Sequence, residues 1–138
     1  MVAAHAAQAY TRIGLETGVA AASPQRLIVM LYDGALAAIV DARAHLRDGR
    51  TDQKGRSIGK AISIVDQGLK AALDVSQGGA IAQQLMDLYD YIGRLLLQAN
   101  LGNDVTRLEE AHRLLSELRG AWAMLAERQG APALASNY

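Results

Sequence analysis

Residues 23–35 of the chain read Ser23-Pro24-Gln25-Arg26-Leu27-Ile28-Val29-Met30-Leu31-Tyr32-Asp33-Gly34-Ala35. Serine is a good N-cap residue, and proline is tolerated at the first helical position because its missing N–H has no helical partner there. We therefore predict that a helix begins at Ser23-Pro24. The residues that follow are apolar on nearly every side of this helix, which is more apolar surface than one packed face uses. The stretch indicates a helical protein with surface left over for a partner.

The composition fits one domain. A chain of 138 residues with 51% hydrophobic content can bury one sizeable core. Its 14 basic and 14 acidic side chains give a net charge of zero, which argues against a general binder of nucleic acid or of anionic membranes. Cysteine is absent, so disulfides and thiolate chemistry are excluded. We find no signal peptide and no apolar run of the roughly 18 residues that a membrane span needs. We therefore expect a soluble cytoplasmic protein without membrane insertion.

Apolar residues recur at helical spacing in four segments, at about residues 24–47, 53–75, 80–101 and 104–129. Glycine-containing breaks separate them at Asp48-Gly49, Gly78-Gly79 and Gly102-Asn103. Because the connections are short, consecutive helices should be antiparallel. We predict an all-α, up-down four-helix bundle over residues 23–129, preceded by a partly ordered N-terminal arm (residues 1–22) and followed by a flexible tail (residues 130–138).

One face of each predicted helix is assigned to the bundle core. On the third helix this face comprises Ile81, Leu85, Leu88, Tyr89, Ile92, Leu96 and Ala99. On the fourth helix it comprises Leu108, Ala111, Leu115, Leu118, Trp122 and Leu125.

A second apolar stripe remains on three of the helices. A bundle helix usually spends about three positions in seven on its core face, and these helices carry more apolar residues than that. The surplus positions are Val29, Leu36 and Val40 on the first helix, Ile64, Gly68, Ala71 and Val75 on the second, and Met86, Gly93 and Leu97 on the third. A single small bundle has difficulty burying both sides of three helices, so we interpret the stripes as docking grooves.

Two alternatives stay open for these stripes. They could form a homodimer interface, or alanine-rich packing could expose less apolar area than the count suggests. In the docking interpretation, Ile64→Asp should abolish partner binding with little loss of helicity, whereas a variant that unfolds would assign Ile64 to the core. In the arm, Tyr10 and Ile13 could pin the chain to a surface of the bundle.

The sequence carries no catalytic or metal-binding pattern. The histidines His5, His45 and His112 lack metal-ligand spacing. No serine lies in a Gly-x-Ser-x-Gly turn, and no glycine-rich phosphate loop precedes a helix. We therefore expect no enzyme activity, no cofactor and no metal. Asp90, between Tyr89 and Tyr91, is the one acidic residue that we single out as a candidate for partial burial.

Several separated motifs between Tyr10 and Trp122 occur together in an order that resembles the flagellar secretion chaperone family FliS. They are Ala9-Tyr10, Ala22-Ser23-Pro24, Met30-Leu31-Tyr32-Asp33-Gly34-Ala35, Lys60-Ala61-Ile62, Asp66-Gln67-Gly68-Leu69, Gly78-Gly79-Ala80-Ile81-Ala82, Leu88-Tyr89-Asp90-Tyr91, Gln98-Ala99-Asn100 and Asn103-Asp104. Because several motifs occur in order, the resemblance is more specific than any one of them.

The resemblance implies a non-enzymatic cytoplasmic chaperone. Such a protein binds the disordered C-terminal region of newly made flagellin in apolar grooves, blocks premature polymerisation and helps deliver flagellin to the type III export apparatus, where an export-gate membrane protein receives the complex. It also implies that the arm carrying Tyr10 covers part of the groove when flagellin is absent. The competing hypothesis is a structural or adaptor bundle, unrelated to export, that homodimerises through the same stripes. We expect the free protein to be a monomer or a weak homodimer.

Overall fold

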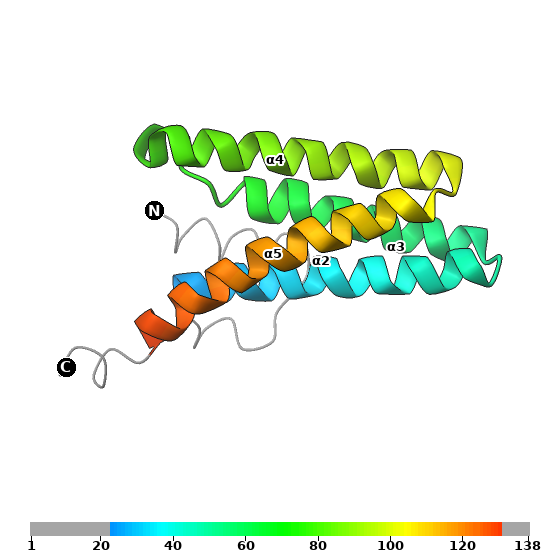
Figure 1. Cartoon of the computed structure of the whole chain (residues 1–138), viewed down its shortest axis with the longest axis horizontal. Coiled ribbons are helices and arrows are strands. Elements are labelled where there is room, and N and C mark those ends of the chain that lie inside the picture. The colour runs from blue at the N-terminus through cyan, green and yellow to red at the C-terminus, as the bar shows by residue number, and fades with distance from the viewer. Residues whose placement is uncertain (1–22, 131–138) are drawn as a thin grey trace.

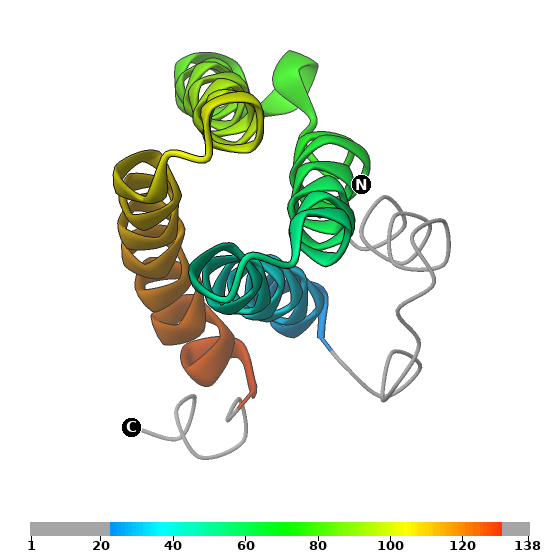
Figure 2. The ribbon, with the colours of Figure 1, turned by 90° about the vertical axis from the view of Figure 1, so that its right-hand side faces the viewer.

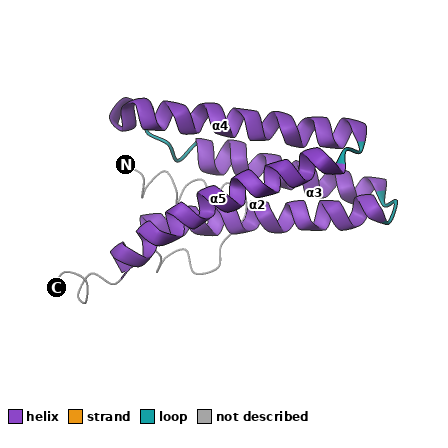
Figure 3. Ribbon diagram, viewed as in Figure 1, coloured by secondary structure: helices purple, strands orange, loops and turns teal. Residues whose placement is uncertain are grey.

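The computed structural model describes residues 23–130, which form helices joined by short loops (Figure 3). The helices are α2 (Pro24–Arg47), α3 (Thr51–Ser63), the π-helix η2 (Ile64–Lys70), α4 (Val75–Gly102) and α5 (Val105–Gly130). Because η2 continues α3 directly, these elements make four continuous helical rods, namely α2, α3–η2, α4 and α5. The proposed arm and most of the proposed tail lie outside the described residues.

The four rods run alternately up and down and form a ring in the order α2, α3–η2, α4, α5 (Figures 1 and 2). The prediction of an all-α, up-down four-helix bundle is confirmed. The rod α5 crosses the bundle obliquely, so that it starts beside α4 and moves away from it toward its C-terminal end (Figure 1). This divergence opens the bundle at the end where α2 begins.

Capping residues fix the ends of α2 where the sequence predicts them. The Ser23 hydroxyl accepts a hydrogen bond from the Arg26 backbone N–H at 3.1 Å, and Pro24 occupies the first turn. After Arg47 the chain reverses at Gly49, whose φ of +73° is in the left-handed region that glycine adopts readily.

The connection between α3–η2 and α4 differs from the prediction. The second helix was expected to reach about residue 75 and to break at the two glycines, but η2 ends at Lys70 and α4 begins at Val75. The reason is the Asp74 side chain, which caps α4 by accepting from the Gln77 backbone N–H at 3.3 Å. The expected break is a kink inside α4 instead, at Gly79.

At the other end of the bundle a buried lysine closes the C-terminus of α4. The Lys54 ammonium, 4% exposed, donates to the Asn100 carbonyl oxygen at 3.0 Å and to Asn103 Oδ1 at 2.5 Å. Asn103 itself ends the helix in the left-handed conformation, with φ 49°. A cation here meets the negative end of the helix dipole and satisfies a carbonyl that has no helical partner. Polar contacts thus tie α3 to the C-terminal end of α4.

The core runs along the inner faces of all four rods. Its members that are essentially inaccessible to solvent include Leu31, Tyr32, Ile39, Ile58, Ile64, Leu69, Ile92, Leu96, Leu108 and Leu115. Two residues assigned to the core from the sequence are wrong at the diverging end, because Ile81 and Leu125 are 71% and 42% exposed. Within residues 23–130, no helix is both long enough and apolar enough to span a lipid bilayer.

Candidate partner-binding site

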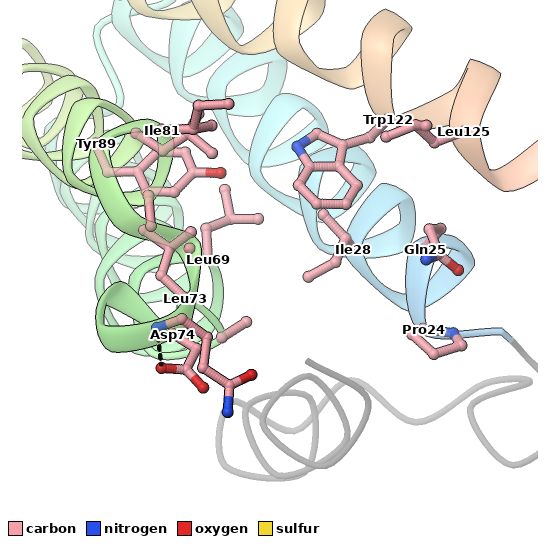
Figure 4. A pocket seen from close by; sticks show the side chains of 15 residues that line it. Pro24, Gln25, Ile28, Leu69, Leu73, Asp74, Ile81, Tyr89, Trp122 and Leu125 are labelled. Carbon is pink, nitrogen blue, oxygen red and sulfur yellow. Dashed lines mark hydrogen bonds between the residues drawn. The ribbon is translucent and has the colours of Figure 1, made fainter. Parts of the chain in front are cut away.

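The diverging end of the bundle contains an apolar cavity of about 620 Å³. We call it the wedge, because it lies where α5 separates from α4 (Figure 1). Side chains from α2, η2, α4 and α5 converge on it in Figure 4. Its apolar wall is formed by Ile28, Leu69, Ala72, Leu73, Ile81, Ala82, Leu85, Tyr89, Trp122 and Leu125.

Few polar side chains line the wedge. Gln25, Asp74 and Gln77 line it, but the Asp74 carboxylate is used for capping α4 and for a hydrogen bond from the Ser76 hydroxyl at 2.7 Å. Opposite them, Trp122 projects from α5 toward α2 and Ile81 stands on the α4 side (Figure 4). Apolar surface of this kind gains free energy when a partner removes it from water, at about 25 cal/mol per Å².

Tyr89 lines the wedge and is paired with the buried Tyr32. The Tyr89 and Tyr32 hydroxyls are hydrogen-bonded at 2.5 Å, and the ring centroids lie 6.4 Å apart with a tilt of 52°. Burial raises the pKa of Tyr89 to about 12, and burial together with Tyr89 raises the pKa of Tyr32, which a side-chain hydrogen bond with Trp122 lowers in part. Both hydroxyls therefore stay neutral at physiological pH and act as hydrogen-bonding groups rather than as charges.

A second cavity, of about 310 Å³, lies between α3–η2 and α4. We call it the outer groove. Its residues are Ile62, Val65, Asp66, Lys70, Tyr89, Asp90, Gly93, Arg94 and Leu97. A Cβ added at Gly93 would meet no atom within 4 Å, so a side chain from a partner can enter above this glycine. Leu97, which is 50% exposed, offers apolar surface beside it.

One lysine ties the two sides of the outer groove together. Lys70 of η2 donates to Asp90 of α4 at 2.6 Å and lies 3.2 Å from Asp66 on its own helix. The hydrogen bond to Asp90 is the main cause that raises the pKa of Lys70, with Asp66 acting in the same direction. The expectation that Asp90 is partly buried agrees with its position at this bridge. Asp66 and Asp90 are thus paired with Lys70, whereas the Arg94 guanidinium lies over the Tyr91 ring, 5.9 Å from its centroid.

The twelve residues predicted as partner-binding are spread over different environments. Tyr10 and Ile13 lie outside the described residues. Val29, Ile64 and Gly68 are buried, so the prediction that they line an accessible stripe is wrong. The reason for Ile64 and Gly68 is that η2 turns them into the bundle. Leu36, Ala71, Met86 and Gly93 are half-buried, and Val40, Val75 and Leu97 are exposed.

Of the predicted residues that lie within 23–130, only Gly93 and Leu97 line the wedge or the outer groove, and both line the outer groove. Sequence reasoning missed the wedge, because Ile81, Leu85, Tyr89, Trp122 and Leu125 follow a regular helical period and were assigned to the core. Periodicity shows which residues share a helix face but not where two facing helices diverge. The wide Trp122 side chain near the end of α5 was the only hint that the packing changes there.

Comparison with known proteins places this chain in a family. The model of the family described as "Flagellar protein FliS" matches residues 6–129. The chain is also 47% identical over 128 residues to the flagellar secretion chaperone FliS of Salmonella typhimurium, which covers 93% of this chain and 95% of that protein. This chain belongs to the FliS family.

Other FliS proteins are similar over nearly the same length. The flagellar secretion chaperone FliS of Escherichia coli is 44% identical over 122 residues, covering 88% of this chain and 90% of its own. The flagellar secretion chaperone FliSB of Pseudomonas aeruginosa is 38% identical over 122 residues, covering 88% of this chain and 96% of its own. The resemblance inferred from the sequence motifs is confirmed, and the family match covers residues 23–129 of the described bundle.

Proposed function

We propose that this chain is a flagellar export chaperone that binds the C-terminal region of flagellin in the wedge and the outer groove. The observation that carries the proposal is the wedge, a large apolar cavity that opens to solvent in a member of a family whose named relatives are flagellar secretion chaperones. A disordered segment that orders on binding loses conformational entropy, and apolar cavities of this kind supply the free energy that offsets the loss.

The physical task of the chaperone follows from this binding mode. Flagellin segments that are disordered alone expose apolar residues, which drive premature assembly. Holding those residues in the wedge and the outer groove keeps them away from other flagellin molecules. We further propose that an export-gate membrane protein of the type III apparatus receives the complex. A pull-down on the soluble domain of that membrane protein, with loaded and with empty chaperone, tests this step. If neither form of the chaperone is retained, the step is contradicted.

The decisive experiment is calorimetric titration with the C-terminal segment of flagellin from the same organism, followed in parallel by far-UV circular dichroism. One-to-one binding with a gain in helicity and a negative heat-capacity change supports the proposal. A stable bundle that gives neither heat nor a helicity change contradicts it.

Surface variants locate the binding. Ile81→Asp in the wedge and Leu97→Asp in the outer groove place a charge at positions that are 71% and 50% exposed, so the fold should persist while an apolar partner is repelled. We expect each to weaken binding at least tenfold. The matched control is Leu101→Asp, at a position that is 79% exposed and lines neither cavity, and it should bind as the parent does.

The alternative, an adaptor bundle that homodimerises through the same apolar surface, predicts a different result. Light scattering would then give a dimer whose dissociation follows Ile81→Asp or Leu97→Asp, with no binding of flagellin. A monomer, or a weak dimer that the flagellin segment dissociates, favours the chaperone.

A further inference from the structure

One residue of α4 lines both the wedge and the outer groove and so forms the wall between them. Ile81, Ala82 and Leu85 line only the wedge, whereas Asp90, Gly93 and Leu97 line only the outer groove. Tyr89 lies between these two sets in the helix and lines both cavities.

The Tyr89 ring is enclosed and tethered. It is 2% exposed, and its hydroxyl is bound to that of the fully buried Tyr32. Trp122, a wall residue of the wedge on α5, packs against the core that contains Tyr32. Protein interiors are close-packed, so a ring that forms the wall between two cavities cannot shift toward one without changing the shape of the other.

We infer that Tyr89 is a positioning residue that couples the two cavities, so that an apolar side chain held in one favours occupancy of the other. The identity of the occupant, a flagellin segment, rests on the proposed function. A partner on either side sets the position of the ring, and the shape of the second cavity is set with it. Coupling of this kind is reciprocal, so occupancy of either cavity raises the affinity of the other by the same factor, typically about 5 to 150.

A double-mutant cycle measures the coupling on the flagellin segment. Ile81 and Leu97 are sixteen residues apart in α4, or about 24 Å, and distant sites without shared partners act independently. Physiological salt screens the two introduced carboxylates at this separation. Each single variant lowers the affinity by some factor, and independent sites would make the double variant lose the product of the two factors. We expect the loss of the Ile81→Asp/Leu97→Asp variant to be at least fivefold smaller than this product. Agreement with the product within twofold overturns the inference while leaving the proposed function standing.

The tyrosine tether is tested in the same cycle. Tyr32→Phe removes the hydrogen bond that holds the Tyr89 ring. In this background we expect the affinity loss of the Ile81→Asp/Leu97→Asp variant to equal the product of the two single losses. Tyr32→Phe alone leaves the Tyr89 hydroxyl unpaired and destabilises the fold, but Tyr32→Phe/Tyr89→Phe removes both partners and should recover stability. If the hydroxyl pair served stability alone, the Tyr32→Phe/Tyr89→Phe variant would regain the coupling as well as the stability. Coupling that persists in the double phenylalanine variant contradicts our assignment.

A second experiment needs no flagellin. The chain has no cysteine and a single tryptophan, Trp122, which reports on the wedge. Leu97→Cys labelled with a hexyl thiosulfonate places an alkyl chain in the outer groove. We expect a shift in Trp122 emission and reduced acrylamide quenching, compared with the same label on Leu101→Cys. Identical emission from both labelled proteins overturns the coupling whatever the flagellin result, whereas a shift without flagellin binding supports the coupling and contradicts the proposed function.

Discussion

At the scale of single residues, the Tyr32–Tyr89 pair is the most consequential polar contact of the core. Two neutral hydroxyls satisfy each other in the core, and the contact joins α2 to α4 across the bundle. Burial is the main reason that both pKa values are raised. Deprotonation of either phenol would put a charge into this apolar environment.

The raised pKa values predict a loss of stability in alkali. The unfolded chain releases its tyrosine protons near pH 10, while folded Tyr89 keeps its proton up to about pH 12. The stability from the pair is therefore complete below pH 10 and falls above it, by about 1.4 kcal/mol per pH unit for each such tyrosine. Urea unfolding between pH 8 and pH 11 measures the slope.

The control for this slope is a third tyrosine on the surface. Tyr91→Phe removes an exposed phenol, whose pKa a hydrogen bond to Glu110 raises, and should leave most of the alkaline loss in place. Tyr32→Phe/Tyr89→Phe should flatten it. If the double variant loses stability as steeply as the parent, other groups titrate in this range.

Ile64 shows where the sequence pattern and the structure give opposite predictions. Its spacing suggested a surface stripe, so that a charge there would affect binding alone, but Ile64 is 1% exposed in the core. We now expect Ile64→Asp to destabilise by at least about 4 kcal/mol, because it removes a buried side chain and buries an unpaired carboxylate. Circular dichroism should show an unfolded or barely folded chain. Leu97→Asp, with the same new charge on the surface, should keep native helicity and melting behaviour.

At the scale of elements, the helix ends were predictable where a local capping motif sets them. Ser23-Pro24 and Asp48-Gly49 bound α2 as expected, since the cap acts within four residues of the sequence. The junction of η2 and α4 was not predictable in the same way. Two glycines favour a break, but Asp74 offers a cap five residues earlier than Gly79, and nothing local decides which prevails. The π-helix η2 is likewise not visible in the spacing of apolar residues along the sequence.

Gly79 provides the prediction at this scale. Its φ of 60° and ψ of −136° fall in a region that a residue with a Cβ enters only at a cost. Gly79→Ala should therefore destabilise the protein by about 1–3 kcal/mol, seen as a lower melting temperature.

The matched control is Gly59→Ala in the exposed interior of α3, where an added Cβ meets nothing. It should stabilise by about 0.5–1 kcal/mol, because alanine loses less backbone entropy than glycine in a helix. If both variants shift the melting temperature upward, the kink at Gly79 is not fixed by its backbone conformation.

At the scale of the whole molecule, the fold class was predictable and the site was not. Four periodic segments with short connections leave few arrangements other than an antiparallel bundle. The crossing angle of α5 depends on how side chains of different elements interlock, and this angle decides that Trp122 and Leu125 line a cavity instead of closing a core. Burial of Val29, Ile64 and Gly68 depends on the same packing. Residue-level assignments from one sequence fail where helix geometry departs from the regular bundle.

The charge distribution of the whole molecule gives the last prediction. The chain has no net charge, the wedge is lined mainly by apolar side chains, and the outer groove carries two acidic and two basic side chains, of which Lys70 pairs with both acids. Long-range attraction then contributes little to binding, and added salt has little to screen. We expect the Kd for the flagellin segment to change less than about threefold between 0.05 M and 0.5 M NaCl, measured by calorimetry. A tenfold weakening would mean that the segment binds through charged groups, and Lys70→Gln would then weaken binding more than Ile81→Asp does.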